Sequence, residues 1–203
     1  MAVRVSAYQA KDYTGLIGMD GFSDDLLNNH FTLYQGYVTN ANKLLELIAG
    51  APKDGKDPRF AEFNRRLGFE WNGMRLHEYY FDALGGNGRV DETSEIYRKL
   101  SEEFGGFENW MEAFKGMGTI RGIGWVALYH DPNTGRCMNF WIGEHHVSHP
   151  SGAHLLLIMD MWEHAFMLDY ALNKNKYMEA FFLNLKWNVI NDRFKASIRC
   201  AGK

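Results

Sequence analysis

Hydrophobic residues in the first part of the chain recur every three to four positions, which is the period of an amphipathic helix. They predict a long helix that begins after Ser23, a residue type that caps helix N-termini, and ends at Gly50. Two aspartates in its first turn favour the same start. His30 lies on or beside the apolar stripe of this helix, where a lone histidine is more often a hydrogen-bonded core residue than a ligand.

A second helix is predicted to follow a short polar link. Asp57 and Pro58 are typical of a helix N-terminus, and hydrophobic residues recur at helical spacing over residues 60–84. His77 lies in the apolar sector of this helix. Two long helices with so short a link favour an antiparallel hairpin, which would place His30 and His77 on facing surfaces.

The hydrophobic pattern changes in the second half of the chain. Shorter helices are expected at residues 94–104 and 108–117, strands at 124–130, 136–142 and 155–159, and a final helix at 175–198. Helices followed by a small sheet are typical of an α+β protein. We therefore predict an N-terminal antiparallel helical hairpin domain, residues 1–90, followed by a C-terminal α/β domain, residues 91–203, with a small three-stranded antiparallel sheet.

Composition narrows the function classes. The 203 residues carry a net charge of -3, so no dominant positive field favours nucleic acid as a partner. No apolar run approaches the roughly 18 residues of a membrane span. No secretory signal is visible in residues 1–20, and the two cysteines, Cys137 and Cys200, match no zinc spacing. The expectation is a cytoplasmic protein with two reduced thiols and no membrane or nucleic-acid partner.

The strongest chemical signal follows the third predicted strand. Asp160 and His164 lie four residues apart, and a carboxylate with a neutral imidazole suits iron, manganese or zinc. This spacing alone is weak evidence, because many helices carry it by chance. A nearby loop contains three histidines. We interpret His146 and His149 as members of a solvated polar loop and treat His145 separately.

Four local motifs together resemble the iron/manganese superoxide dismutase family. They are His30 followed by Gly36-Tyr37-Val38-Thr39-Asn40, then Leu76-His77-Glu78-Tyr79-Tyr80-Phe81, Gly122-Ile123-Gly124-Trp125, and Asp160-Met161-Trp162-Glu163-His164-Ala165-Phe166. The last is highly specific, and the order and spacing of the first two support it. The resemblance covers most of the chain, from about Leu26 to the last helix.

The resemblance implies a set of site residues. The metal ligands would be His30, His77, Asp160 and His164, binding one iron or manganese ion per chain, with water or hydroxide in a fifth position. Tyr37 would be the gateway tyrosine of the substrate channel, and His145 the hydrogen-bond donor to the bound solvent. Other implied positions are Trp125 and Trp162 in the pocket wall, Gly73 beside the metal, and Glu163, which would reach a partner's ligand histidine across a dimer interface.

The chain also departs from the commonest family pattern. Tyr34 stands where many members have a histidine, Met167 where many have a tyrosine, and Lys174 where an interface arginine is usual. Lysine cannot form the bidentate fork of arginine. These departures affect the expected interface proton path and place the chain in a divergent branch.

The resemblance implies an enzyme that converts superoxide to dioxygen and hydrogen peroxide by alternating reduction and oxidation of its metal ion. We favour iron over manganese, and a homodimer or homotetramer. The alternative is a non-catalytic metal-binding or structural relative with the same fold. A non-haem iron oxygenase is disfavoured, because that class uses two histidines and one carboxylate.

Overall fold

The computed structural model describes residues 7–53 and 55–200. The elements in chain order are η1 (Thr14–Leu16), α1 (Asp24–Gly50), α2 (Pro58–Asp82), α3 (Glu95–Phe104), α4 (Phe107–Gly118), β1 (Gly124–Asp131), β2 (Arg136–Gly143), β3 (His154–Asp160), η2 (Glu163–Ala165), α5 (Met167–Tyr170), α6 (Lys174–Leu183) and α7 (Trp187–Cys200). A helical hairpin thus precedes a mixed part with a three-stranded sheet, as the sequence predicted.

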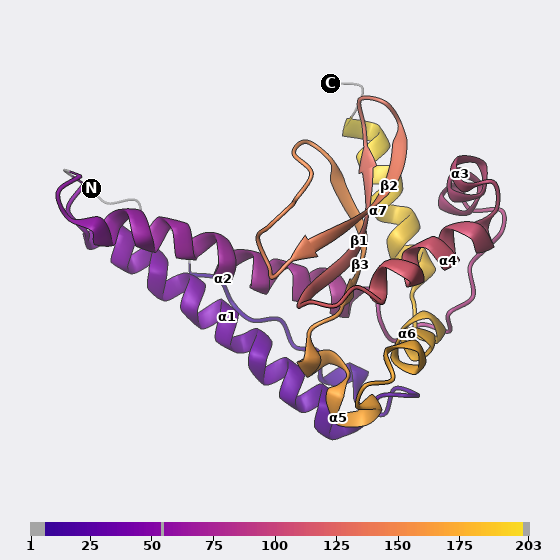
Figure 1. The fold of residues 1–203 in the computed structure, drawn as a ribbon, viewed down its shortest axis with the longest axis horizontal. Helices are drawn as coiled ribbons and strands as arrows, with labels where there is room; N and C mark the ends of the chain where they lie inside the picture. Colours follow the sequence, from indigo (N-terminus) through magenta and orange to yellow (C-terminus); the bar gives the residue numbers. More distant parts are fainter. Residues whose placement is uncertain (1–6, 54, 201–203) are drawn as a thin grey trace.

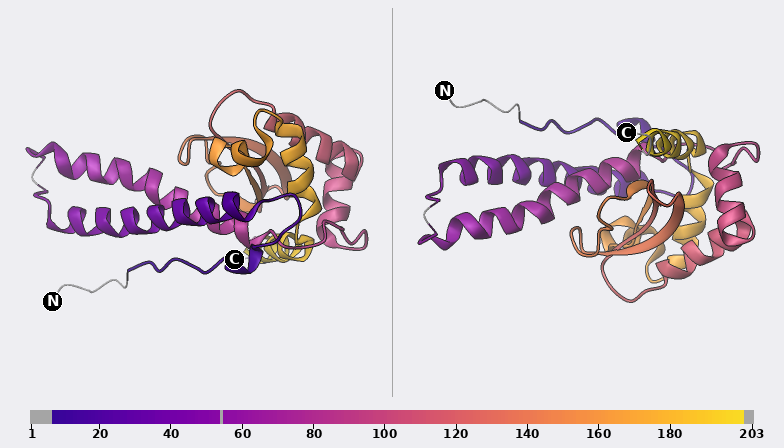
Figure 2. Two further views of the ribbon diagram at one scale, coloured as in Figure 1. Left: turned by 90° about the horizontal axis from the view of Figure 1, so that it is seen from below. Right: turned by 90° about the horizontal axis from the view of Figure 1, so that it is seen from above.

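The long hairpin of α1 and α2 projects from one side of the molecule (Figures 1 and 2). Its helices begin where the sequence indicated, because the side chain of Ser23 accepts a hydrogen bond from the Leu26 backbone and Asp57 caps α2 through Arg59. The half nearest the sheet is the buried half, and it contains both His30 and His77. The hairpin therefore presents two histidines to the sheet.

The sheet is antiparallel, with strand order β2-β1-β3. β1 is central and nearly all of it is buried, while β3 contacts both α2 and α7. In the register of β1 with β3, Trp125 pairs with Asp160, whose carboxylate lies beside His30 and His77 of the hairpin. The sheet consequently positions Asp160, the last residue of β3, next to the histidines of the hairpin.

The prediction of a single final helix at residues 175–198 is wrong. The chain forms α6 and α7, and the break between them is held by long-range backbone contacts. Leu185 forms a β-bridge with Leu84, and the Lys186 N–H donates to the Ala83 carbonyl at 2.8 Å. These bonds to the end of α2 replace helical ones, and helical periodicity through the segment carries no sign of them.

Two further expectations concern the rest of the chain. Within the described ranges, every helix is too short or too polar to cross a membrane. Cys137 is a buried free thiol, as expected, and burial raises its pKa to about 12. The side chain of Cys200 lies outside the part of the chain that the structure describes.

Candidate metal centre

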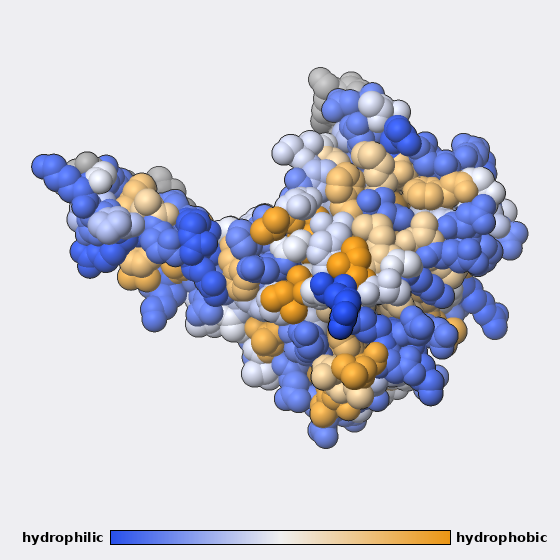
Figure 3. All heavy atoms as spheres, in the orientation of Figure 1, coloured by the Kyte–Doolittle hydropathy of each residue, from blue (hydrophilic) through white to orange (hydrophobic). Residues whose placement is uncertain are grey.

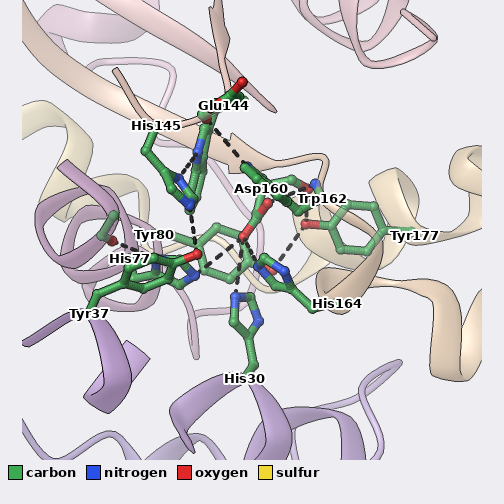
Figure 4. A network of polar contacts seen from close by, with 12 residues as sticks. His30, Tyr37, His77, Tyr80, Glu144, His145, Asp160, Trp162, His164 and Tyr177 are labelled. Carbon is green, nitrogen blue, oxygen red and sulfur yellow. Dashed lines mark hydrogen bonds and ion pairs between the residues drawn. The ribbon is translucent and has the colours of Figure 1, made fainter. Parts of the chain in front are cut away.

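Four side chains from four elements converge between the hairpin and the sheet (Figure 4). They are His30 of α1, His77 of α2, Asp160 at the end of β3 and His164 of η2, and their ligand atoms all lie within 4.8 Å of one another. The structure therefore brings together all four residues that the family resemblance implied as metal ligands. The short 3-10 turn η2 follows Trp162 and directs His164 back toward Asp160.

One carboxylate oxygen is the focus of the cluster. Oδ2 of Asp160 lies 3.2 Å from Nε2 of His30, 3.6 Å from Nε2 of His77 and 3.1 Å from Nε2 of His164. Metal bonds of about 2.1 Å to nitrogen or oxygen would place neighbouring ligand atoms about 3.0–3.6 Å apart. The observed spacing fits four ligands around one ion.

The hydrogen-bonding state of the histidines gives an independent test of that fit. Nδ1 of His77 lies 2.6 Å from the Gly73 carbonyl, which can only accept, so Nδ1 carries the hydrogen and Nε2 presents a lone pair. Nε2 of His77 and both ring nitrogens of His30 are buried without hydrogen-bond partners among the described residues. Unpaired buried nitrogens facing a buried carboxylate are costly unless a cation lies between them.

The charge states also suit a metal. Burial lowers the pKa of His30, and burial is also the largest cause that holds the pKa of His77 well below its ordinary value. Burial opposes ionisation of Asp160, yet His164 and His30 outweigh it and keep the pKa of this carboxyl below its usual range. The centre thus offers two imidazoles that burial keeps neutral, those of His30 and His77, together with the imidazole of His164 and one carboxylate.

Two tyrosines that the sequence did not single out support the backbone of Asp160, one directly and one through the other. The hydroxyl of Tyr177 donates to the Asp160 carbonyl at 2.6 Å and accepts from Tyr80 at 3.1 Å. The backbone N–H of Trp162 donates to Oδ1 of Asp160 at 2.9 Å, which leaves Oδ2 to face the histidines. Tyr80 lies one turn after His77 on the same helix face, a spacing that could have revealed it. Tyr177 is distant in sequence, and no local signal marks it.

A hydrogen-bonded chain runs beside the ligands. Nε1 of Trp125 donates to Nδ1 of His145 at 3.0 Å, and Nε2 of His145 lies 2.7 Å from the Tyr37 hydroxyl. Burial lowers the pKa of His145 to about 4, so the ring is neutral near pH 7. Because an indole only donates, Nδ1 accepts, and Nε2 carries the hydrogen that it donates to Tyr37. The Tyr37 hydroxyl can then donate its own hydrogen to another acceptor.

Aromatic rings close around this chain. Trp162 stacks on His145 with ring centroids 4.6 Å apart, and Phe69, which the sequence reading missed, meets His145 edge-on at 4.7 Å. Gly73, which the resemblance implied to lie beside the metal, has no side chain and leaves space on this face of α2. That space is taken by Tyr37, since a Cβ on Gly73 would lie 2.6 Å from its ring. The rings wall the centre on the Tyr37 side.

The residues at the divergent positions have distinct surroundings. Tyr34 is buried and its hydroxyl donates within the same chain to Glu78, which also binds Arg75. Met167 is 42% exposed. Lys174 donates to the Ile120 carbonyl at 3.0 Å.

His164 is the candidate ligand that reaches the surface. Its side chain is 21% exposed, whereas those of the other three ligands are at most 1% exposed. It borders a surface groove with Glu163, and the other lining residues are Leu26, Asn29, Met167 and Leu168. Hydrophobic side chains gather over α5 on the face shown in Figure 3.

The interpretation of His149 as a solvated loop residue is wrong. His149 is partly buried and its ring bonds to Tyr129 and to the His145 carbonyl. His146 is also partly buried and meets the ring of Phe69 at 5.6 Å. The sequence places these histidines in a loop but does not show what that loop packs against.

Comparisons with known proteins agree with this geometry. Residues 92–193 match the family model described as iron/manganese superoxide dismutases, C-terminal domain. The chain is 29% identical to an iron superoxide dismutase of Aquifex aeolicus over 202 residues, covering 96% of this chain and 94% of the relative. It is 32% identical to an iron superoxide dismutase of Cupriavidus metallidurans over 187 residues, covering 89% and 92%. A manganese superoxide dismutase of Haloarcula marismortui is 26% identical over 170 residues, covering 84% and 83%.

Proposed function

Because this chain belongs to the iron/manganese superoxide dismutase family, we propose that its four-residue centre holds one iron or manganese ion and dismutates superoxide. Two superoxide anions and two protons give one dioxygen and one hydrogen peroxide. The observation that carries the proposal is the convergence of His30, His77, Asp160 and His164, with unpaired nitrogens facing one carboxylate oxygen. The ion would supply one-electron redox chemistry; the remaining roles belong to the protein.

The ligand set favours attraction of a small anion. The imidazoles of His30 and His77 are kept neutral by burial, and Asp160 contributes the single negative charge of the set. With either a divalent or a trivalent cation the centre keeps a net positive charge. A second carboxylate would have weakened that attraction.

Tyr37 is the residue we propose as proton donor at the centre. Burial raises the pKa of its phenol, so the hydroxyl keeps its hydrogen near neutral pH. The family resemblance implied that His145 is the hydrogen-bond donor to the bound solvent, but its Nε2 hydrogen is directed to the Tyr37 oxygen. We therefore propose that His145 orients Tyr37, while Tyr37 donates from its hydroxyl and narrows access together with Phe69 and Trp162.

Iron is the ion that we propose for this chain. Carboxylate and imidazole accept iron and manganese alike, so the donor set does not distinguish them. The preference rests on relatives that cover nine-tenths of the chain and are iron enzymes. Activity of protein reconstituted with manganese alone would reverse this assignment.

We further propose that a second copy of the chain covers the groove beside His164. A partly exposed ligand next to exposed Met167 and Leu168 favours burial by a partner, and Glu163 lies at the same edge. A homodimer is the simplest assembly, with a homotetramer as its possible extension, and we place the enzyme in the cytoplasm. Leu168→Glu should shift the sedimentation coefficient to that of a monomer and speed metal loss; an unchanged coefficient would contradict this interface.

The function is tested by reconstitution. Protein loaded with iron or with manganese should accelerate superoxide decay in proportion to metal per chain. The alternative, a non-catalytic relative, predicts full metal loading without acceleration. The intact ligand set favours the enzyme, because a relic is free to lose a ligand.

A further inference from the structure

The loop between β2 and β3 carries His145 in a tight turn at its start, in a backbone that needs outside support. A β-bridge between Gly143 and Val147 closes a tight turn, with N–H to carbonyl distances of 3.1 Å in both directions. Glu144 and Ser148 on either side have φ angles of 49° and 71°, in the left-handed region that non-glycine residues rarely adopt. Such residues persist where surrounding contacts hold them.

His149 supplies one such contact through both ring nitrogens. Its Nε2 lies 2.9 Å from the His145 carbonyl oxygen, and its Nδ1 lies 3.0 Å from the Tyr129 hydroxyl. The carbonyl only accepts, so Nε2 carries the hydrogen. In the neutral ring Nδ1 then accepts from Tyr129. This tyrosine is 4% exposed on the central strand β1, so the two bonds connect the loop tip to the most buried strand.

Loss of the two hydrogen bonds of His149 would affect the candidate centre through His145. The two ring nitrogens of His145 form hydrogen bonds simultaneously, Nδ1 with Trp125 at 3.0 Å and Nε2 with Tyr37 at 2.7 Å. Its backbone carbonyl is the atom that His149 holds. A shift of that backbone should lengthen both hydrogen bonds of the ring, because stacking against Trp162 restricts how far the ring can move to compensate.

We propose that His149, held by Tyr129, positions His145 and thereby the hydroxyl of Tyr37. This role rests on the proposed superoxide dismutase function. Within the part of the chain that the structure describes, His149 forms hydrogen bonds to Tyr129 and to the His145 backbone and to none of the four proposed metal ligands, so it is a positioning residue. Its loss should therefore leave metal binding intact while slowing turnover.

The test uses the full-length protein and compares substitutions at His149 and Tyr129. His149→Phe keeps a ring and removes both hydrogen bonds, and it should slow superoxide decay per bound metal about tenfold, a typical result of misplacing a reacting group by part of an ångström. His149→Gln retains a donor for the His145 carbonyl and should recover most of the rate. Tyr129→Phe removes the outer bond alone and should fall between them.

His130→Phe is the matched control. His130 is the next residue along β1, is 3% exposed and pairs with Ser197 at 2.8 Å, so this variant also loses a buried histidine bond. Its side chain points to the opposite face of the strand from that of Tyr129. It should lose stability but keep the wild-type rate per bound metal.

Nitrogen-15 spectra of the imidazole rings in metal-free protein provide a readout separate from activity. Wild-type His145 should show a single Nε2–H tautomer, and His149→Phe should show an averaged pair of ring nitrogens. Because these spectra need no metal and no turnover, they test the positioning even in protein without dismutase activity. His149→Phe with a wild-type rate and an unchanged His145 spectrum overturns the proposal. If His149→Phe does not fold, the same two readouts on Tyr129→Phe decide it.

Discussion

Replacing Gly73 by alanine tests the tight contact between α2 and Tyr37. The new Cβ would lie 2.6, 2.8 and 2.9 Å from three carbons of the Tyr37 ring. The ring must retreat by about 1 Å to reach the usual carbon–carbon contact distance. That movement is enough to break the 2.7 Å hydrogen bond between its hydroxyl and Nε2 of His145.

The expected magnitude combines three effects. Overpacking costs about 1–3 kcal/mol and the lost hydrogen bond about 1 kcal/mol, whereas alanine in a helix gains about 1 kcal/mol over glycine. Gly73→Ala should therefore lower the free energy of unfolding by about 1–3 kcal/mol. Metal content should be unchanged, because the Gly73 carbonyl still receives the hydrogen bond of His77.

Gly68→Ala is the matched control on the same helix. A Cβ at Gly68 meets nothing within 4 Å, and the Gly68 carbonyl also accepts from a side chain four residues on, that of Asn72. This variant should gain up to about 1 kcal/mol of stability and keep the full rate. Urea unfolding and superoxide decay per bound metal measure both. Equal stability gains and equal rates for the two variants would refute the reasoning.

Three more substitutions address the centre itself. His77→Ala should abolish metal retention and activity together; a metal-loaded, active variant would remove His77 from the ligand set. Tyr37→Phe should keep the metal and slow proton-linked turnover, as stopped-flow decay over a range of pH would show; metal loss would make Tyr37 structural. Burial lowers the pKa of His145 to about 4 from 6.5, so the unfolded chain binds a proton first as the pH falls. Between those values the free energy of unfolding should fall by about 3 kcal/mol through this group, and His145→Gln should show a correspondingly flatter urea-unfolding profile against pH; an identical slope would count against the buried neutral ring.

Local signals predicted the elements whose determinants are local. Ser23, Asp57 and Pro58 mark helix starts, and the apolar run before Asp160 marks the strand that delivers it. The division of the final helix depends on the Lys186 N–H bonding to Ala83, about a hundred positions away, which no periodicity records.

The four candidate ligands could be named from the sequence because their motifs resemble those of a known family, whereas the residues that support them could not. Tyr177 reaches Asp160, and Tyr37 fills the space at Gly73, only once helices and sheet have packed. His149 illustrates the same limit, because its loop position suggested solvent while its partners lie on a distant strand. Residues that position other side chains through long-range contacts are not marked by any local sequence pattern.

Product stoichiometry during sustained turnover tests the central claim most directly. Protein loaded with one iron or manganese ion per chain should consume many equivalents of superoxide per metal and release dioxygen and hydrogen peroxide in equal amounts. That result requires one centre to serve both half-reactions. Consumption of a single equivalent per metal, or peroxide without matching dioxygen, would contradict dismutation at this centre.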